Sequence, residues 1–160
     1  MRSYQVFAAM SQQQAEALLD ALAETSPAAA AQALAAASAA LKARAVYVKR
    51  LPPERRAAAV RRALARVGAN TLAEEILAVY FLECRKPLLL EWLDASGVEH
   101  EDGTLKEKTP PEPAAEALAA AVKRFRKGDA GGDRELLLRA FAAQSSIDWP
   151  ALDALLEDAG

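Results

Sequence analysis

The chain is poor in the residues from which metal centres and catalytic sites are commonly built. Its 160 residues include one histidine and one cysteine. A helical metal site needs two histidines one turn apart or a repeated Glu-x-x-His motif, and neither can be formed with one histidine. The seven glycines fit neither of the glycine-rich phosphate-binding motifs. The sequence therefore favours a non-catalytic protein with no cofactor and no metal.

Strand patterns and long apolar runs are also missing. No segment alternates Val, Ile or Thr with polar residues as a half-buried strand does, and no apolar run is long enough to span a bilayer. The first ten residues lack the basic region and apolar run of a secretory leader. We therefore expect an all-α, soluble, cytoplasmic protein without a membrane segment. Arginine outnumbers lysine and isoleucine is scarce, which favours a bacterial source with a GC-rich genome.

Helix start and stop signals, in contrast, follow one another along the chain. Ser11 with Gln14, and Thr71 with Glu74, match the capping box that opens a helix. Proline after serine or proline marks further starts, and glycine marks ends. We predict a bundle of about six to eight helices. Helices are expected over about 11–25, 27–48, 54–67, 72–85, 88–95, 114–127 and 134–144, with a short last helix after Asp148.

One long stretch without helical periodicity divides these helices. It spans 98–113, is acidic, and ends in several prolines. The sequence therefore predicts an α-helical core over 1–97, an acidic connector over 98–113, and C-terminal helices over 114–160 that pack on the core as one compact unit. A second, glycine-rich loop is expected over 128–133.

Charge is distributed unevenly along the chain. Nine basic residues and one acidic residue lie between Lys42 and Arg66, which gives this segment a charge of +8. Because the whole chain carries −2, the remainder carries −10. A basic helical block in an acidic protein indicates an electrostatic contact, either with another molecule or within the chain.

A helical wheel places the arginines of the segment 54–67 on one side of a helix. Arg55, Arg62 and Arg66 form a narrow stripe, opposite Val60 and Val67. After its first residue this helix has no acid to balance the arginines. We define the basic ridge as the five arginines of this helix, which are Arg55, Arg56, Arg61, Arg62 and Arg66.

The sequence leaves two kinds of partner open for the basic ridge. We expect an acidic protein surface or self-association, and the acidic segment 91–102 of the chain itself is one candidate. Sequence-independent binding of nucleic acid is the alternative. It is less favoured, because Glu74 and Glu75 begin the helix that would enter a groove, and Tyr47 is the one aromatic residue near the ridge that could stack on a base.

The carboxylate of Glu83 is the remaining candidate for a special role. On a regular helix it shares a side with Ile76 and Val79, so we predict a buried carboxylate paired with an arginine of a neighbouring helix. A further hypothesis combines Glu83 with Glu91 and His100 as an enzymatic base or a metal site. The acids around His100 are instead expected to form a solvated loop.

Overall fold

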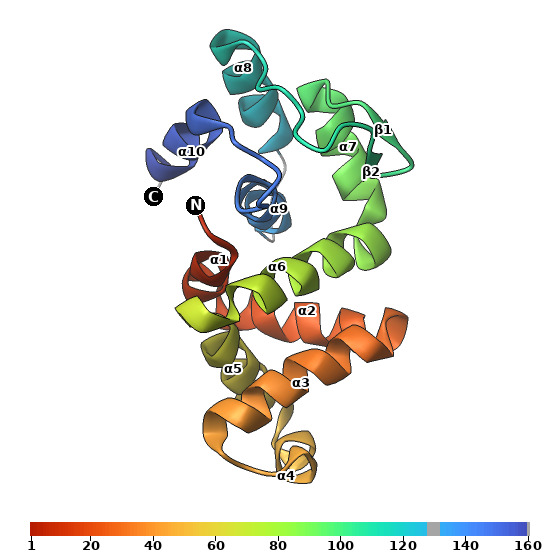
Figure 1. The fold of residues 1–160 in the computed structure, drawn as a ribbon, viewed down its shortest axis with the longest axis vertical. Helices are drawn as coiled ribbons and strands as arrows, with labels where there is room; N and C mark the ends of the chain where they lie inside the picture. The colour runs from red at the N-terminus through yellow and green to blue at the C-terminus, as the bar shows by residue number, and fades with distance from the viewer. Residues whose placement is uncertain (128–131, 160) are drawn as a thin grey trace. The chain divides into compact units, whose positions relative to one another are not determined.

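The computed structural model describes residues 1–127 and 132–159 (Figure 1). Helices dominate these residues and confirm the all-α prediction, although they are more numerous than predicted. The α-helices are α1 (Ser3–Ala9), α2 (Gln12–Thr25), α3 (Pro27–Leu41), α4 (Ala45–Arg50), α5 (Pro53–Leu64), α6 (Asn70–Val79), α7 (Lys86–Ser96), α8 (Ala115–Phe125), α9 (Asp133–Ala142) and α10 (Pro150–Glu157). The other elements are the 3-10 turn η1 (Val67–Ala69), the π-helical turn η2 (Tyr80–Cys84), and the strands β1 (His100–Glu101) and β2 (Thr104–Leu105).

The helices divide into two compact units. The N-terminal unit is Arg2–Cys84, and the C-terminal unit is Arg85–Gly160 together with Met1. The predicted boundary after residue 97 therefore differs from the observed one, because the helix breaks at Arg85 and α7 packs with α8. The predicted connector 98–113 likewise belongs to the C-terminal unit.

The N-terminal unit is built around α5, which packs against α1, α2 and α3. The face that α2 buries is rich in leucine, whereas the face that α3 buries consists of alanines. Alanine has almost no side chain, so helix backbones that meet at alanines can approach closely. The capping box of α2 forms as predicted: the Ser11 side chain accepts from the Gln14 amide at 3.1 Å, and the Gln14 side chain accepts from the Ser11 amide at 2.9 Å.

The predicted helix over 27–48 is interrupted at Lys42. Its start at Pro27 is confirmed, but Lys42 adopts the left-handed conformation with φ of 52° and ends α3 after Leu41. The Ala43 amide then donates to the Ser38 carbonyl at 3.1 Å, an arrangement that commonly closes a helix. The short helix α4 follows and packs on α3 at one end of the N-terminal unit (Figure 1).

Two further sequence predictions for this unit are wrong. The helix α5 ends at Leu64, and Gly68 lies inside η1 instead of capping α5. Thr71 lies within the first turn of α6 and not before it, so the second capping box does not form. Residues 65 and 66 form a turn after α5, and η1 then runs directly into α6, so Gly68 and Thr71 both lie inside helical turns.

The C-terminal unit has an aromatic core. Trp92 of α7 lies 5.4 Å from Phe125 of α8 and 5.8 Å from Phe141 of α9, measured between ring centroids. Phe141 in turn lies 5.1 Å from Trp149, which precedes α10. These four rings are buried and join all four helices of the unit.

The segment predicted as a connector is attached to this core. Asp102 and Gly103 both have positive φ, at 53° and 94°, and form the tight turn of a hairpin between β1 and β2. Further along, the Trp149 indole donates to the Pro110 carbonyl at 2.9 Å, and the Glu112 carboxylate accepts from the Ala151 amide at 2.7 Å. The predicted loop over 128–133 falls largely outside the described residues.

Helices in the described ranges are too short or too polar to cross a membrane. This finding agrees with the absence of a bilayer-length apolar run in the sequence.

The faces of α5 and η1 can be tested with two valine substitutions. Val60 is 3% exposed and Val67 is 71% exposed. We expect Val60→Ala to lower the free energy of unfolding by about 2 kcal/mol, because it removes buried methyl groups and leaves a cavity. Val67→Ala should change it by less than about 0.5 kcal/mol. Urea denaturation measures both, and an equal loss in the two variants would contradict the observed end of α5.

Candidate interaction surface

Helix α5 separates its arginines from its apolar residues. Its buried side chains are Ala57, Val60, Ala63 and Leu64. Arg55 and Arg62, and Arg66 just after the helix, are exposed, as the helical wheel predicts. Val67 was predicted on the buried side, but it follows the end of α5 and points to solvent.

Two of the five ridge arginines are held by backbone carbonyls. Arg56 donates to the Lys49 carbonyl of α4 at 3.0 Å. Arg61 donates to the Met10 carbonyl, just after α1, at 2.6 Å. These two side chains are half-buried and fasten α5 to its neighbours. The basic ridge therefore consists of two structural arginines and three, Arg55, Arg62 and Arg66, that are fully available to a partner.

The basic side chains between residues 42 and 66 are not neutralised locally. In the described part of the chain, none of these nine side chains has a carboxylate oxygen within ion-pair distance. Lys42, Arg44, Lys49 and Arg50 are exposed along with the three free ridge arginines. Unpaired cations concentrated on one segment produce a positive field that attracts acidic molecules.

Exposed apolar residues lie in the same part of the chain, and sequence reasoning missed them. Among the described residues, five large apolar side chains are exposed, and four of them lie between residues 41 and 67. Tyr47 is 58% exposed and Val46 is 56% exposed, because α4 buries Val48 against the unit and turns its other side to solvent. The helix α4 is short and buries one residue, so its sequence pattern is weak. It could have been predicted only if the end of α3 had been placed correctly. The exposed apolar residues of the segment are Leu41, Val46, Tyr47 and Val67.

The acidic segment 91–102 has partners inside its own unit. Glu91 makes a bidentate pair with Arg134, at 2.6 and 3.0 Å, and Asp102 pairs with Lys86. Asp94 contacts the His100 ring nitrogen Nε2 at 2.7 Å. These three carboxylates are therefore already engaged, whereas Glu99 and Glu101 remain exposed.

His100 has a structural place in the hairpin. Its Nδ1 accepts from the Gly103 amide at 3.1 Å, so the proton of the neutral ring lies on Nε2 and points to Asp94. Glu91 and His100 thus each have their own partners. No group of three potential metal-ligating side chains occurs among the described residues.

The prediction that Glu83 is a buried carboxylate is wrong. It lies in the π-helical turn η2 and is exposed. A π turn contains an extra residue, so side chains after Val79 are rotated around the axis relative to a regular α-helix. This rotation carries Glu83 away from the face that contains Ile76. Glu83 therefore does not lie on the buried face with Ile76, and this shared face was the reason for predicting its ion pair with an arginine of a neighbouring helix.

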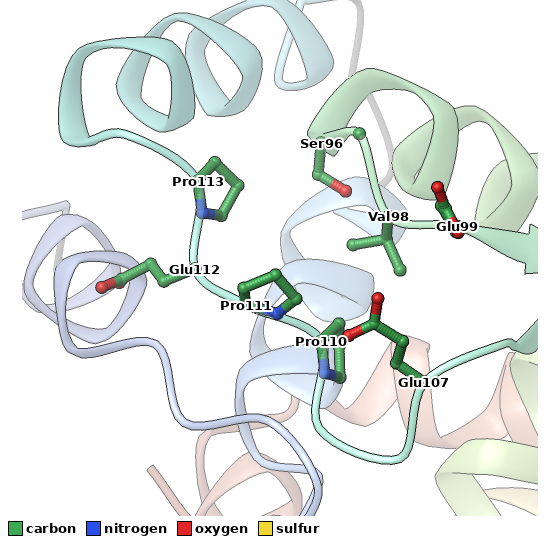
Figure 2. Close-up of a pocket in the computed structure, with 9 residues that line it drawn as sticks. Ser96, Val98, Glu99, Glu107, Pro110, Pro111, Glu112 and Pro113 are labelled. Atoms are coloured by element: carbon green, nitrogen blue, oxygen red, sulfur yellow. The ribbon is translucent and has the colours of Figure 1, made fainter.

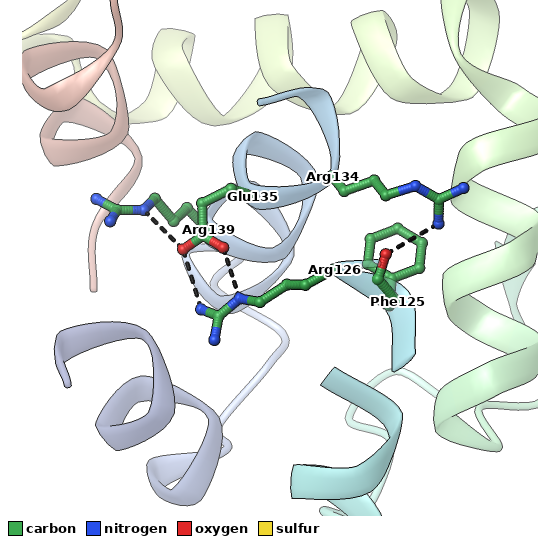
Figure 3. Close-up of polar contacts among 5 residues, drawn as sticks. All are labelled: Phe125, Arg126, Arg134, Glu135 and Arg139. Atoms are coloured by element: carbon green, nitrogen blue, oxygen red, sulfur yellow. Dashed lines mark hydrogen bonds and ion pairs between the residues drawn. The ribbon is translucent and has the colours of Figure 1, made fainter. Parts of the chain in front are cut away.

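Glu135 is a half-buried carboxylate that lies between two arginines (Figure 3). Its oxygens accept from Arg126 at 2.7 and 3.1 Å and from Arg139 at 3.4 Å. Glu135, Arg126 and Arg139 are each exposed by less than a third. The neighbouring Arg134 turns the other way and lies 4.8 Å from the centre of the Phe125 ring. These contacts join α8 to α9.

A pocket of about 390 Å³ lies beside the proline-rich segment (Figure 2). Ser96 and Val98 lie on one side of it and Pro110 to Pro113 on the other. Glu107 and Glu99 give its rim a negative charge, while Glu112 is used to cap α10. Ser96 is the buried polar side chain among the lining residues, and its hydroxyl already donates to the Leu93 carbonyl at 3.2 Å.

Comparison of the chain with protein-family models, curated proteins and solved structures gives no match.

The two carboxylates, Glu83 and Glu135, provide a matched test. We expect Glu83→Gln to change the free energy of unfolding by less than about 0.5 kcal/mol, because the side chain is exposed. Glu135→Gln should lower it by about 1 kcal/mol, since it weakens charged hydrogen bonds to Arg126 and Arg139 that solvent partly screens. Thermal and urea denaturation measure both. A larger loss in Glu83→Gln would restore the prediction that Glu83 is a structural partner.

Proposed function

We propose that this protein is a non-catalytic interaction module that binds an acidic protein surface through its basic ridge. The observation that supports the proposal is that the nine basic side chains of the segment 42–66 form no ion pair with any residue that the structure describes. An unpaired cationic surface raises the rate of association with acidic partners and rejects basic ones. We further propose that it acts in the cytoplasm, which is supported by the single cysteine, because no disulfide can form within the chain.

An acidic protein is favoured over nucleic acid by the surroundings of the ridge. Tyrosine and arginine are enriched at protein interfaces, and exposed aliphatic side chains add area that a protein partner can bury. Leu41, Val46 and Val67 supply such area on the same segment of the chain as the arginines. A phosphate backbone would gain little from contact with them. The net charge of −2 also weakens binding to nucleic acid.

Charge reversal at two ridge arginines tests the proposal. Fluorescein-labelled poly-L-glutamate serves as the acidic probe, and anisotropy measures its binding to the full chain at physiological salt. We expect Arg55→Glu with Arg62→Glu to weaken binding by at least about tenfold through like-charge repulsion. The fold should be retained, because both side chains point away from the buried face of α5.

A second pair of substitutions controls for net charge. Lys123 and Arg124 are exposed basic residues of α8, in the C-terminal unit. Lys123→Glu with Arg124→Glu changes the net charge by the same amount as the ridge double variant and should leave poly-L-glutamate binding nearly unchanged. Equal weakening in both double variants would mean that total charge governs the binding, and it would contradict a role specific to the ridge.

Nucleic acid is retained as a second candidate because Tyr47 is 58% exposed on the same basic segment and could stack on an unpaired base. We expect mixed-sequence duplex DNA and single-stranded RNA to bind more weakly than poly-L-glutamate at physiological salt. If the ridge bound duplex DNA, each phosphate contact would add roughly 0.9 to the slope of log affinity against log salt. Tight, salt-sensitive DNA or RNA binding that the ridge double variant abolishes would favour this second candidate.

A further inference from the structure

The exposed apolar residues and the unpaired cations occupy the same stretch of the N-terminal unit. Four of the five exposed large apolar side chains in the described chain fall between residues 41 and 67, as does the whole basic block. Large apolar side chains on a protein surface mark interaction sites when they cluster. A partner that satisfied both features would need carboxylates and apolar side chains on one face.

A groove of about 350 Å³ lies within this stretch. Alanines of α3 form one wall, and the end of α5 with η1 forms the other. Arg66 and Gly68 line the groove, and the exposed Val67 lies between them in the chain. Leu41, also exposed, directly follows Ala40, which lines the opposite wall. The groove is therefore apolar inside, has an arginine in its lining, and is flanked by exposed aliphatic residues.

We propose that this groove binds an acidic amphipathic helix of another protein. The inference rests on the proposed function and specifies its partner. Apolar side chains repeated along one face of such a helix would enter the groove, and carboxylates beside them would meet Arg62 and Arg66, for which the described structure holds no acidic partner. Charge complementarity selects an acidic helix over a basic or neutral one.

The shape of the site distinguishes this occupant from a lipid surface. Anionic membranes also attract segments that combine basic and apolar residues, but they bind surfaces that project toward the bilayer. The groove is a shallow depression that runs between two helical segments, and such a depression suits a row of side chains on one helix face. A depression of this kind therefore favours a helix over a membrane.

Two designed peptides test the proposal. Both contain the same leucines and glutamates. In one, the leucines lie on a single helical face, and in the other they are spread around the helix. We expect the full chain to bind the amphipathic peptide at least about tenfold more tightly than the permuted one, because burying one or two leucines is enough for that factor. Fluorescence anisotropy at physiological salt measures both affinities.

Gly68 allows the groove to be filled without strain in the backbone. It does not have positive φ, and a Cβ added there meets no atom within 4 Å. Gly68→Leu should therefore fold normally and reduce the preference for the amphipathic peptide to about twofold or less. Ala39→Leu, at an exposed position in the opposite wall, should act in the same way. Gln13→Leu, which adds the same side chain on the exposed side of α2, is the matched control and should keep the preference.

The results separate this inference from the proposed function. If poly-L-glutamate binds through the ridge but both groove variants keep the peptide preference, the groove is not the site and the inference is wrong. If neither probe binds, the proposed function fails as well. Binding to vesicles of phosphatidylglycerol but to neither peptide would replace the helix by a membrane. Concentration-dependent self-association that Gly68→Leu abolishes would replace it by a second copy of the chain.

Discussion

Close contact between alanine-rich helix faces is the constraint on which the N-terminal unit depends. The face that α3 buries consists of alanines, and α5 buries two alanines together with Val60 and Leu64. Helices that meet at such faces leave no space for an arginine stem between them. Every arginine of α5 must therefore lie at the border of the interface or outside it. The exposed ridge is in this sense a direct consequence of the way the core is packed.

The two units handle charge differently. The N-terminal unit has ten basic and seven acidic side chains, a net charge of +3, and the C-terminal unit has ten basic and fifteen acidic, a net charge of −5. In the C-terminal unit several acids are joined to cations by ion pairs, such as Glu91 with Arg134 and Glu135 with Arg126. The cations of the segment 42–66 have no such partners in the described structure. Attraction for an external acid is thus concentrated on one segment.

Sequence reasoning succeeded at several helix starts and failed where the backbone departs from a regular α-helix. The capping box at Ser11 and the start at Pro27 are present, whereas the capping box predicted at Thr71 does not form, because η1 runs into α6. The predicted burial of Glu83 required a regular helix through residue 83, and the π turn at Tyr80–Cys84 breaks that assumption. A π turn has no characteristic amino-acid composition, so it could not be predicted from the sequence.

The exposed side of the candidate site was predictable only in part. The stripe containing Arg55 and Arg62 follows from helical periodicity alone. The apolar residues beside it do not, because the end of α3 depends on a left-handed Lys42, a conformation that lysine seldom adopts. Proline and acidic composition suggested a connector over 98–113, and the sequence did not reveal the tertiary hydrogen bonds from Trp149 and Ala151 that attach this segment to its unit.

Because Arg56 donates a hydrogen bond to the Lys49 carbonyl, it has a structural role that the exposed arginines of the basic ridge do not have. Because α4 is short and rests mainly on α3, this bond is an important restraint on its last turn. A carboxylate that captured Arg56 would remove the donor from that carbonyl and loosen the helix that displays Tyr47. Capture of Arg55, Arg62 or Arg66 would disturb nothing. A ligand spaced to contact Arg55, Arg62 and Arg66 alone would leave Arg56 bonded to the Lys49 carbonyl and α4 ordered.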